Sequence, residues 1–217
     1  MGAIGGGTLA LCAVVFDYGE VLSGHPDPGA KAELLRITGL PLDRFEELYW
    51  ADRPAYDGGK LNGIDFWQKL LRDANLNLGP GTAAELNQWD ARMWTTSNPA
   101  MLAWQLELKR RGILTAILSN MGHDVLENMK REFDWLSRFD VLAWSFQLHM
   151  VKPNPAIYRH VLGELGTRPE ETLFLDDRLI NIQAAQALGF QAIQFSSAAK
   201  LRDDLIAKGL DRTLPLP

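Results

Sequence analysis

Residues 9–22 read LALCAVVFDYGEVL, an apolar run that ends abruptly at Asp17. Such a run, closed by a polar residue, is typical of a strand buried on both faces of a parallel sheet. We therefore predict a central strand over Thr8–Phe16, with Asp17 just beyond its carboxyl end. The glycine-rich residues 2–7 follow no strand and carry no basic segment. This argues against a dinucleotide-binding loop and against a signal peptide.

The C-terminal half of the chain alternates between short apolar runs and amphipathic segments of about ten residues, as βαβ units of a mostly parallel sheet do. Asn98 followed by Pro99 marks the start of the first helix, and Gly112 marks its end. Strands are predicted at Leu114–Leu118, Val141–Trp144, Thr172–Leu175 and Gln191–Phe195, and helices at Pro99–Arg111, His123–Phe133, Pro155–Leu165 and Ile180–Leu188.

Residues 24–97 have a different texture, with helical periodicity, glycine punctuation and no strand pattern. The simplest organisation is an all-helical unit inserted after the first strand of an α/β core. We predict a doubly wound, mostly parallel α/β core formed by residues 8–23 and 98–217, with the small helical unit at 24–97. Its helices are predicted at Pro28–Ile37, Leu42–Trp50, Ile64–Asp73 and Thr82–Met93.

The composition limits the classes of protein to which the chain can belong. With 217 residues, 47% apolar and 23% charged, the chain can bury one core plus a smaller unit and is not disordered. A net charge of −5 argues against a broad nucleic-acid-binding surface. The single cysteine, Cys12, excludes a disulfide framework and a multi-cysteine zinc site. No run approaches the roughly 18 apolar residues of a membrane span, and we expect a cytoplasmic protein.

Polar residues follow four of the predicted strands at the point where each strand ends. In open parallel sheets, ligands bind at the carboxyl ends of the strands, so these residues are expected to meet at one edge. Each alone has an ordinary explanation, such as a helix cap or a solvated lysine. The residues are Asp17 after the first strand, Ser119 and Asn120 after the second, Lys152 after the third, and Asp176 and Asp177 after the fourth.

The residue types indicate phosphoryl transfer. Asp17 and Asp177, helped by Asp176, are suited to hold Mg²⁺, which prefers oxygen ligands and binds substrate phosphates. A carboxylate such as Asp17 is also a known nucleophile in aspartyl-phosphate chemistry. The substrate implied is a small molecule that carries a phosphate group.

The other three residues supply donors and positive charge. Ser119 and Asn120 can donate hydrogen bonds to the phosphoryl oxygens, and Lys152 can neutralise charge and keep Asp17 ionised. Phosphoryl transfer depends mainly on such positioning and charge neutralisation. Asn181 is expected either to orient Lys152 or simply to pack.

The ordered set of motifs over residues 9–195 resembles the haloacid dehalogenase-like (HAD) hydrolase superfamily, including members similar to a bacterial glucose-1-phosphate phosphatase. The resemblance implies a Rossmann-like core with a small helical cap, which would be residues 24–97. It implies that Asp17 is the nucleophile and that Mg²⁺ is held by Asp17, Asp177 and the main-chain carbonyl of Gly19. Asp176 would contact the Mg²⁺ only through a bridging water, or would lie behind the residues that bind the ion directly.

One position departs from the pattern of the superfamily's phosphatases. Most of them carry a second Asp two residues after the nucleophile as general acid and base, whereas this chain has Gly19. Loss of a general acid typically costs about 10²–10⁴-fold in rate. We expect a substrate whose leaving group needs little protonation, such as the anomeric oxygen of a sugar phosphate. Glu20 is a substitute acid that lies one residue out of register.

Two other functions stay open at this point. A 2-haloacid dehalogenase shares the aspartate nucleophile, the Ser-Asn pair and the lysine but needs no metal, and it lacks the acidic pair Asp176-Asp177. A low-turnover phosphate-binding regulatory protein would also fit Gly19. Within the cap, Arg53 and Tyr56 are the expected substrate contacts, and Trp50 and Trp94 are candidates for the pocket lining. The motifs carry no signal for an oligomeric state.

Overall fold

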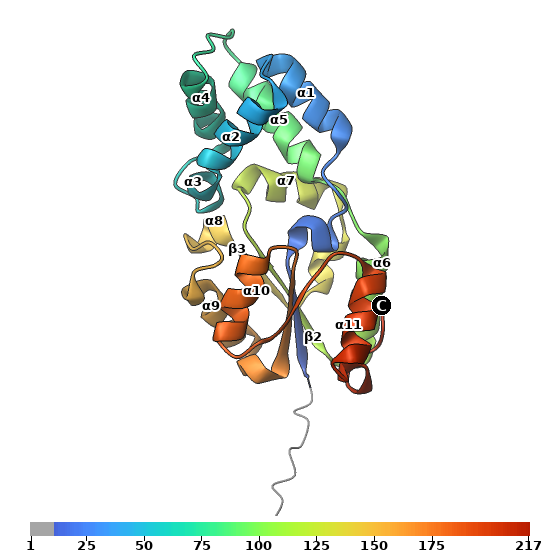
Figure 1. Ribbon diagram of the computed structural model, residues 1–217. Coiled ribbons are helices and arrows are strands. Elements are labelled where there is room, and N and C mark those ends of the chain that lie inside the picture. The colour runs from blue at the N-terminus through green and yellow to red at the C-terminus, as the bar shows by residue number, and fades with distance from the viewer. Residues whose placement is uncertain (1–10) are drawn as a thin grey trace, which may run out of the picture.

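The computed structural model describes residues 11–217 (Figure 1). The first strand, β1, covers Ala13–Phe16, and all four of its residues are buried. The predicted strand began earlier, at Thr8. Its residues 8–10 and the glycine-rich residues 2–7 lie outside the described part of the chain.

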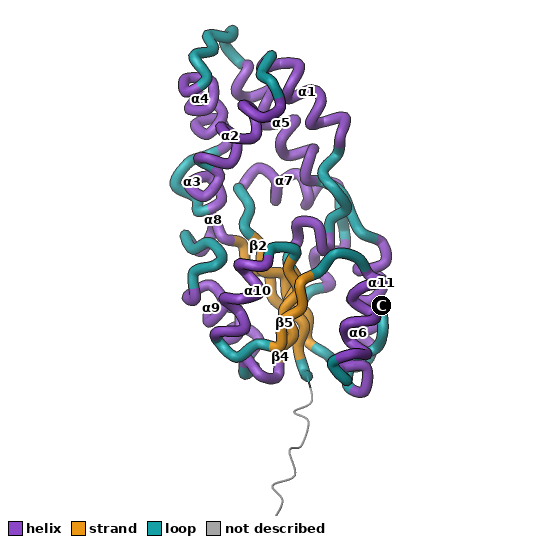
Figure 2. The backbone as a smooth tube through the Cα atoms, in the orientation of Figure 1, coloured by secondary structure: helices purple, strands orange, loops and turns teal. Residues whose placement is uncertain are grey.

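Five parallel strands form one sheet in the order β3-β2-β1-β4-β5. Strand β1 lies at the centre, with Phe16 in register with Ile117 of β2 and with Leu175 of β4. Figure 2 shows the sheet enclosed by helices, so the predicted α/β fold with a doubly wound parallel sheet is confirmed. The remaining strands are β2 (Leu114–Ser119), β3 (Val141–Trp144), β4 (Thr172–Asp176) and β5 (Gln191–Gln194).

The sheet is covered by helices on both faces, because successive strand residues alternate between two hydrophobic clusters. Val14 and Phe16 belong to one cluster, with the buried residues of α6, α7 and α11. Ala13 and Val15 belong to the other, with those of α9 and α10. The helices are α6 (Pro99–Arg110), α7 (His123–Glu132), α9 (Pro155–Leu165), α10 (Leu179–Ala187) and α11 (Ala198–Ala207), with short turns η2 (Trp135–Arg138), η3 (Pro169–Glu171) and η4 (Leu210–Arg212).

The inserted segment folds into five helices that lie beyond the carboxyl ends of the strands (Figure 1). These helices bury their own hydrophobic cluster, which includes Phe45, Phe66 and Trp67. We call residues 24–97 the cap; its division from the core at these residues stays a prediction. The helices are α1 (Pro28–Thr38), α2 (Leu42–Ala51), α3 (Arg53–Asp57), α4 (Gly63–Asp73) and α5 (Thr82–Trp94).

The helices and strands predicted from the sequence are present, and within the described residues most of their ends agree to one residue. Two short helices, α3 and α8 (Ser145–Leu148), were not predicted, because four or five residues are too few to show helical periodicity. Helix α11 was also not predicted. Among residues 11–217, no helix is long and apolar enough to cross a bilayer.

The cap and the core meet at a tightly packed contact between Tyr56 and Gly122. Gly122 precedes α7, and a Cβ atom built on it would lie 2.0 Å from the ring of Tyr56 in α3. The Tyr56 ring is 1% exposed and stacks on Phe66, with the ring centroids 5.2 Å apart. The ring therefore has no free space into which it can retreat.

We predict that Gly122→Ala destabilises the fold by about 1–3 kcal/mol, because the added methyl group overpacks the cap–core contact. The backbone of Gly122 has φ −83° and ψ 164°, which alanine adopts without strain, so the effect isolates the steric contact. Urea unfolding of both proteins measures the difference in free energy.

The matched control is Gly163→Ala in helix α9, where a new Cβ atom meets nothing within 4 Å. This change is expected to stabilise the protein by about 0.5–1 kcal/mol, the usual gain for removing a helical glycine. Equal stabilities for the Gly122→Ala and wild-type proteins would contradict the tight cap–core contact.

Candidate active site

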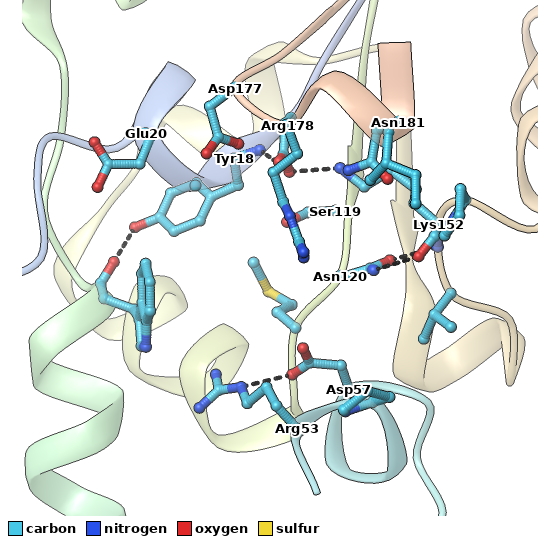
Figure 3. Close-up of a pocket in the computed structure, with 18 of the residues that line it drawn as sticks. Tyr18, Glu20, Arg53, Asp57, Ser119, Asn120, Lys152, Asp177, Arg178 and Asn181 are labelled. Carbon is cyan, nitrogen blue, oxygen red and sulfur yellow. Dashed lines mark hydrogen bonds and ion pairs between the residues drawn. The ribbon is translucent and has the colours of Figure 1, made fainter. Parts of the chain in front are cut away.

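A cavity of about 480 Å³ lies between the carboxyl ends of the strands and the cap (Figure 3). Its core side includes Asp17, Ser119 and Asp177, from the ends of β1, β2 and β4, and Lys152, from the loop after α8. These residues, predicted from the sequence to meet at one edge of the sheet, line one cavity in the structure, and the roles assigned to them stay predictions. The cap contributes Trp50, Arg53, Pro54, Asp57 and Trp94.

The ammonium group of Lys152 lies between two carboxylates. Its Nζ atom is 2.9 Å from Oδ1 of Asp17 and 2.7 Å from Oδ2 of Asp176. The Lys152 side chain is 1% exposed, so both ion pairs are shielded from solvent. Asp17 also accepts a hydrogen bond from the N–H of Tyr18 at 2.7 Å, which orients its carboxylate.

Asp176 is fully buried, and both of its carboxylate oxygens accept hydrogen bonds from neighbouring protein groups. Besides Lys152, it accepts hydrogen bonds from Nδ2 of Asn181 at 2.9 and 3.0 Å and from the N–H of Arg178 at 2.9 Å. Asn181 therefore reaches Lys152 through Asp176, which is one of the two roles expected for it. Asp176 does not line the cavity. The indirect metal role expected for it stays a prediction.

The three carboxylates Asp17, Asp176 and Asp177 have oxygen atoms within 4.8 Å of one another. This spacing is close to the distance of about 4.2 Å across an octahedral Mg²⁺ shell with ligands near 2.1 Å. Three carboxylates and one lysine leave two uncompensated negative charges, which one divalent cation would balance. The residues present therefore fit the predicted Mg²⁺.

Burial and charge act against each other in this group. Burial raises the pKa of Asp17 to about 7, with Asp176 and Asp177 adding to the rise and Lys152 opposing it. Burial also raises the pKa of Asp177. Burial alone would lower the pKa of Lys152, but the two adjacent carboxylates outweigh it and raise that pKa. Lys152 thus remains charged. A further cation beside Asp17 would favour the ionised form of the Asp17 carboxylate.

Ser119 and Asn120 follow β2 but have different surroundings. The Asn120 side chain accepts a hydrogen bond from the N–H of Lys152 at 2.8 Å and donates one to its carbonyl oxygen at 3.0 Å. It therefore holds the main chain of Lys152, a role that the sequence did not reveal. Ser119 is 2% exposed and lines the cavity, and its hydroxyl has no hydrogen-bond partner within residues 11–217. Ser119 is thus a donor that is still free for a substrate oxygen.

Tyr18–Leu22 form a kinked helical turn, η1, after β1. Within it, Glu20 has a φ of 58°, a left-handed conformation that is unusual for a residue other than glycine. Its carboxylate forms an ion pair with Nδ1 of His25 at 2.6 Å. A Cβ atom built on Gly19 would meet nothing within 4 Å, so a methyl group would fit at this position.

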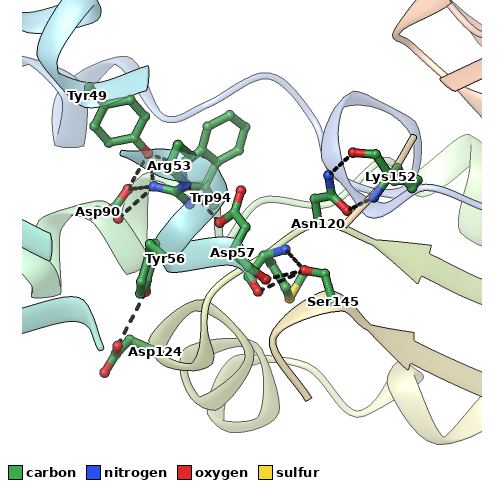
Figure 4. Close-up of polar contacts among 11 residues, drawn as sticks. Tyr49, Arg53, Tyr56, Asp57, Asp90, Trp94, Asn120, Asp124, Ser145 and Lys152 are labelled. Atoms are coloured by element: carbon green, nitrogen blue, oxygen red, sulfur yellow. Dashed lines mark hydrogen bonds and ion pairs between the residues drawn. The ribbon is translucent and has the colours of Figure 1, made fainter. Parts of the chain in front are cut away.

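Arg53, the substrate contact expected in the cap, lines the cavity but is already bound to protein groups (Figure 4). Its Nε atom donates to Oδ1 of Asp57 at 3.0 Å, and its Nη1 atom donates to both oxygens of Asp90 at 3.0 and 3.1 Å. The Arg53 side chain is 6% exposed. Tyr56, the other expected contact, is buried against the core and does not line the cavity.

Asp57 and Arg178 also line the cavity, although neither was predicted as a site residue from the sequence. Asp57 precedes Gly58 and Gly59, and that pattern indicates only a turn. Arg178 follows the acidic pair, where helix capping is an adequate explanation. Arg178 lies in the core between β4 and α10, whereas Asp57 reaches the cavity only because the cap is docked on the core.

A family model described as haloacid dehalogenase-like hydrolase matches residues 13–189. The chain belongs to the haloacid dehalogenase-like hydrolases. The predicted resemblance to this superfamily is thereby confirmed, and the chain is a hydrolase by family. Phosphatase MT3486 of Mycobacterium tuberculosis (strain CDC 1551 / Oshkosh) is 27% identical in an alignment of 212 residues that covers 91% of this chain and 93% of that protein.

Solved structures of HAD enzymes share the fold. A HAD family enzyme of Bacteroides thetaiotaomicron in complex with magnesium and inorganic phosphate has a TM-score of 0.69 and 21% identity, covering 85% of this chain and 93% of that chain. L-2-haloacid dehalogenase from Xanthobacter autotrophicus has a TM-score of 0.63 and 22% identity, covering 91% and 83%. Both likenesses show the fold alone, so the reaction has to be argued from the site.

We predict that Lys152→Met destabilises this HAD hydrolase by about 3–5 kcal/mol in the presence of EDTA, the usual cost of removing one partner of a buried ion pair. Three carboxylates would then face one another without a positive charge. Urea unfolding measures the loss, and added Mg²⁺ is expected to recover part of it.

The control for this prediction is Lys200→Met, which removes an exposed lysine paired with Asp204 in α11. Such surface pairs contribute only about 0–1 kcal/mol. If Lys152→Met costs no more than Lys200→Met, the buried lysine does not hold the carboxylates together.

Proposed function

We propose that the protein is a Mg²⁺-dependent phosphomonoester hydrolase that acts on a small phosphorylated metabolite through an aspartyl-phosphate intermediate. The observation that carries the proposal is the group Asp17, Asp176 and Asp177 around Lys152, next to the free hydroxyl of Ser119. The related phosphatase of M. tuberculosis and the HAD structure that contains magnesium and phosphate support it.

Asp17 is the nucleophile in this proposal. Its carboxylate lies at the end of β1, where the Tyr18 N–H and Lys152 hold it in one orientation. An Asp17 oxygen forms a bond to phosphorus as the bond between phosphorus and the leaving oxygen breaks. Water then attacks the phosphorus of the intermediate and frees Asp17. A preoriented nucleophile has little freedom left to lose on the way to the transition state.

The other core residues bind and neutralise the phosphoryl group. Ser119 donates a hydrogen bond to one phosphoryl oxygen, and the Lys152 ammonium adds positive charge beside the attacked phosphorus. Asn120 and Asp176 position Lys152 from its main chain and from its Nζ atom. Mg²⁺ would be held by Asp17, Asp177 and the Gly19 carbonyl, with Asp176 behind them, and when bound it offsets charge on the phosphate.

A dehalogenase mechanism fits the site less well. Haloacid dehalogenases use the same kind of nucleophile without a metal, so the pocket should carry no uncompensated negative charge near the leaving halide. Here Asp177 lines the cavity beside Asp17. The third reading, a phosphate-binding protein with little turnover, would not require Asp17 to be buried, oriented and paired with Lys152 as it is.

The finer proposal is that the metabolite is a sugar phosphate. It depends on Gly19, which provides no acid at the position that most phosphatases of the superfamily use. An anomeric oxygen is a less basic leaving group than an alkoxide and therefore needs less protonation.

We predict that the purified protein releases phosphate from phosphomonoesters with Mg²⁺ and stops when EDTA is added. Asp17→Asn should remove this activity by at least about 10³-fold, because the amide is not a nucleophile. Phosphate release is measured with and without Mg²⁺. The control is the melting temperature, which should not fall in Asp17→Asn, since the amide oxygen still accepts the Tyr18 hydrogen bond.

Two results would contradict this function. Halide release from a 2-haloacid that continues in EDTA would indicate a dehalogenase. Phosphate binding without phosphate release would indicate the regulatory protein.

A screen of sugar phosphates and nucleotides with Mg²⁺ tests the substrate class. We expect the highest kcat/KM for a sugar 1-phosphate, whose leaving oxygen is anomeric. A nucleotide or a simple alkyl phosphate as the best substrate would exclude the sugar-phosphate proposal and leave the phosphatase activity itself standing.

A further inference from the structure

The direction in which the leaving group departs limits which residue can protonate it. In phosphoryl transfer the attacking and leaving oxygens lie roughly in line on opposite sides of phosphorus. Asp17 attacks from the core side, so the leaving oxygen faces the cap. Figure 3 shows Arg53 and Asp57 on the side of the cavity opposite Asp177 and Arg178. This step rests on the proposed function, because it takes Asp17 as the nucleophile.

Four carboxylates line the cavity, and three of them are unsuited to protonate a group on the cap side. Asp17 is the nucleophile, and Asp177 lies next to it on the core side. Glu20, the substitute acid expected from the sequence, is also on the core side and is paired with His25. The remaining carboxylate is that of Asp57, at the end of α3 in the cap.

Asp57 has one oxygen atom available to the cavity. Its Oδ1 accepts the hydrogen bond from Arg53, while no hydrogen bond from residues 11–217 reaches its Oδ2. The side chain retains 12% exposure although the backbone is anchored. That anchor is the hydroxyl of Ser145 in the core, which donates to the Asp57 carbonyl oxygen at 2.6 Å. The core therefore fixes the position of Asp57 relative to the strand ends.

The charges around Asp57 favour a proton on it. Arg53 is the single cation of a buried group that also contains Asp57 and Asp90. Asp90 is 0% exposed, contacts Arg53 through both oxygens and accepts a further hydrogen bond from Tyr49. One guanidinium cannot balance two carboxylates, and the uncompensated charge falls on Asp57, which faces the cavity.

The pKa of Asp57 agrees with this charge count. Burial raises it to about 6, and Asp90 adds to the rise, while Arg53 and the more distant Arg178 oppose it. A group with a pKa near the working pH can both give and take a proton, which is the requirement for an acid that must later act as a base.

We propose that Asp57 of the cap is the general acid and base of this hydrolase, in the role left open by Gly19. An acid at this position would also admit substrates whose leaving oxygen is more basic than an anomeric oxygen. As Asp17 bonds to phosphorus, the Asp57 carboxylic acid gives its proton to the leaving oxygen, which departs as an alcohol. The resulting Asp57 carboxylate then takes a proton from the water that attacks the intermediate. That second step forms inorganic phosphate, frees Asp17 and restores the acid, so protons balance over the cycle.

The test compares two esters that differ in their need for a proton. The leaving group of 4-nitrophenyl phosphate is a weak base that departs unprotonated, whereas a simple alkyl phosphate must expel a strongly basic alkoxide. We expect Asp57→Asn to lower the first-step rate, measured as alcohol release in a single turnover, by about 10²–10⁴-fold for the alkyl ester. The burst of nitrophenolate from the nitrophenyl ester should keep its rate, while the second step, which is common to both esters, slows. Asp57→Glu, which keeps the carboxyl group, should restore part of the alkyl activity.

Asp90→Asn is the matched control, because Asp90 holds the same guanidinium but does not line the cavity. If Asp57 served only to position Arg53, the Asp57→Asn and Asp90→Asn variants would slow the first step of both esters alike. Such parallel losses would overturn the acid role, as would an Asp57→Asn variant that cleaves the alkyl ester at the wild-type rate.

The same assays separate this proposal from the function on which it rests. If wild-type protein releases phosphate from neither ester, the phosphatase function fails, and the acid role fails with it. If wild-type protein cleaves both esters and Asp17→Asn cleaves neither, the function holds. The ratio of the two rates in Asp57→Asn then decides the role of Asp57 alone.

Discussion

The buried ammonium group of Lys152 binds the carboxylates of Asp17 and Asp176 and thereby joins the loop after β3 to the ends of β1 and β4. Asn120 extends this connection to β2 by bonding both main-chain polar groups of Lys152. Through its side chain and its main chain, Lys152 thus links the ends of β1, β4 and β2 to the loop after α8. Without it, the acids gathered at this edge would repel one another, and the edge could not stay compact.

Carboxylates outnumber basic side chains at two places around the cavity, and the two excesses of negative charge have different consequences. On the core side, three carboxylates outnumber one lysine, and a divalent cation can make up the difference. On the cap side, two carboxylates outnumber Arg53, and no comparable group of acids is there to hold a metal. A proton is then the remaining way to balance the charge. One enclosed site therefore combines a place for a cation with a place for a transferable proton.

The cap has a chemical as well as a selective part in this arrangement. Tyr56 packs against Gly122, and Ser145 holds the main chain of Asp57, so the cap meets the core through close contacts directly beside the cavity. A group carried by the cap is correctly placed only when those contacts are made. Chemistry that needs Asp57 would thus be confined to the closed form, in which bulk water is excluded.

Short-range patterns in the chain were sufficient for the sheet, most of the helices and the family. Apolar runs ending in Asp17, Ser119 and Asp176 mark strand ends, and parallel strands bring such ends to one edge whatever the loops between them do. Short helices such as α3 were not predicted, because a single helical turn is too short to show a hydrophobic periodicity. The capture of Arg53 by Asp90, the hold of Asn120 on Lys152 and the exposure of one Asp57 oxygen to the cavity were decided by tertiary structure. Each depends on which of several equally polar side chains lies within about 3 Å once the cap has docked, and hydrogen bonds act only over that distance.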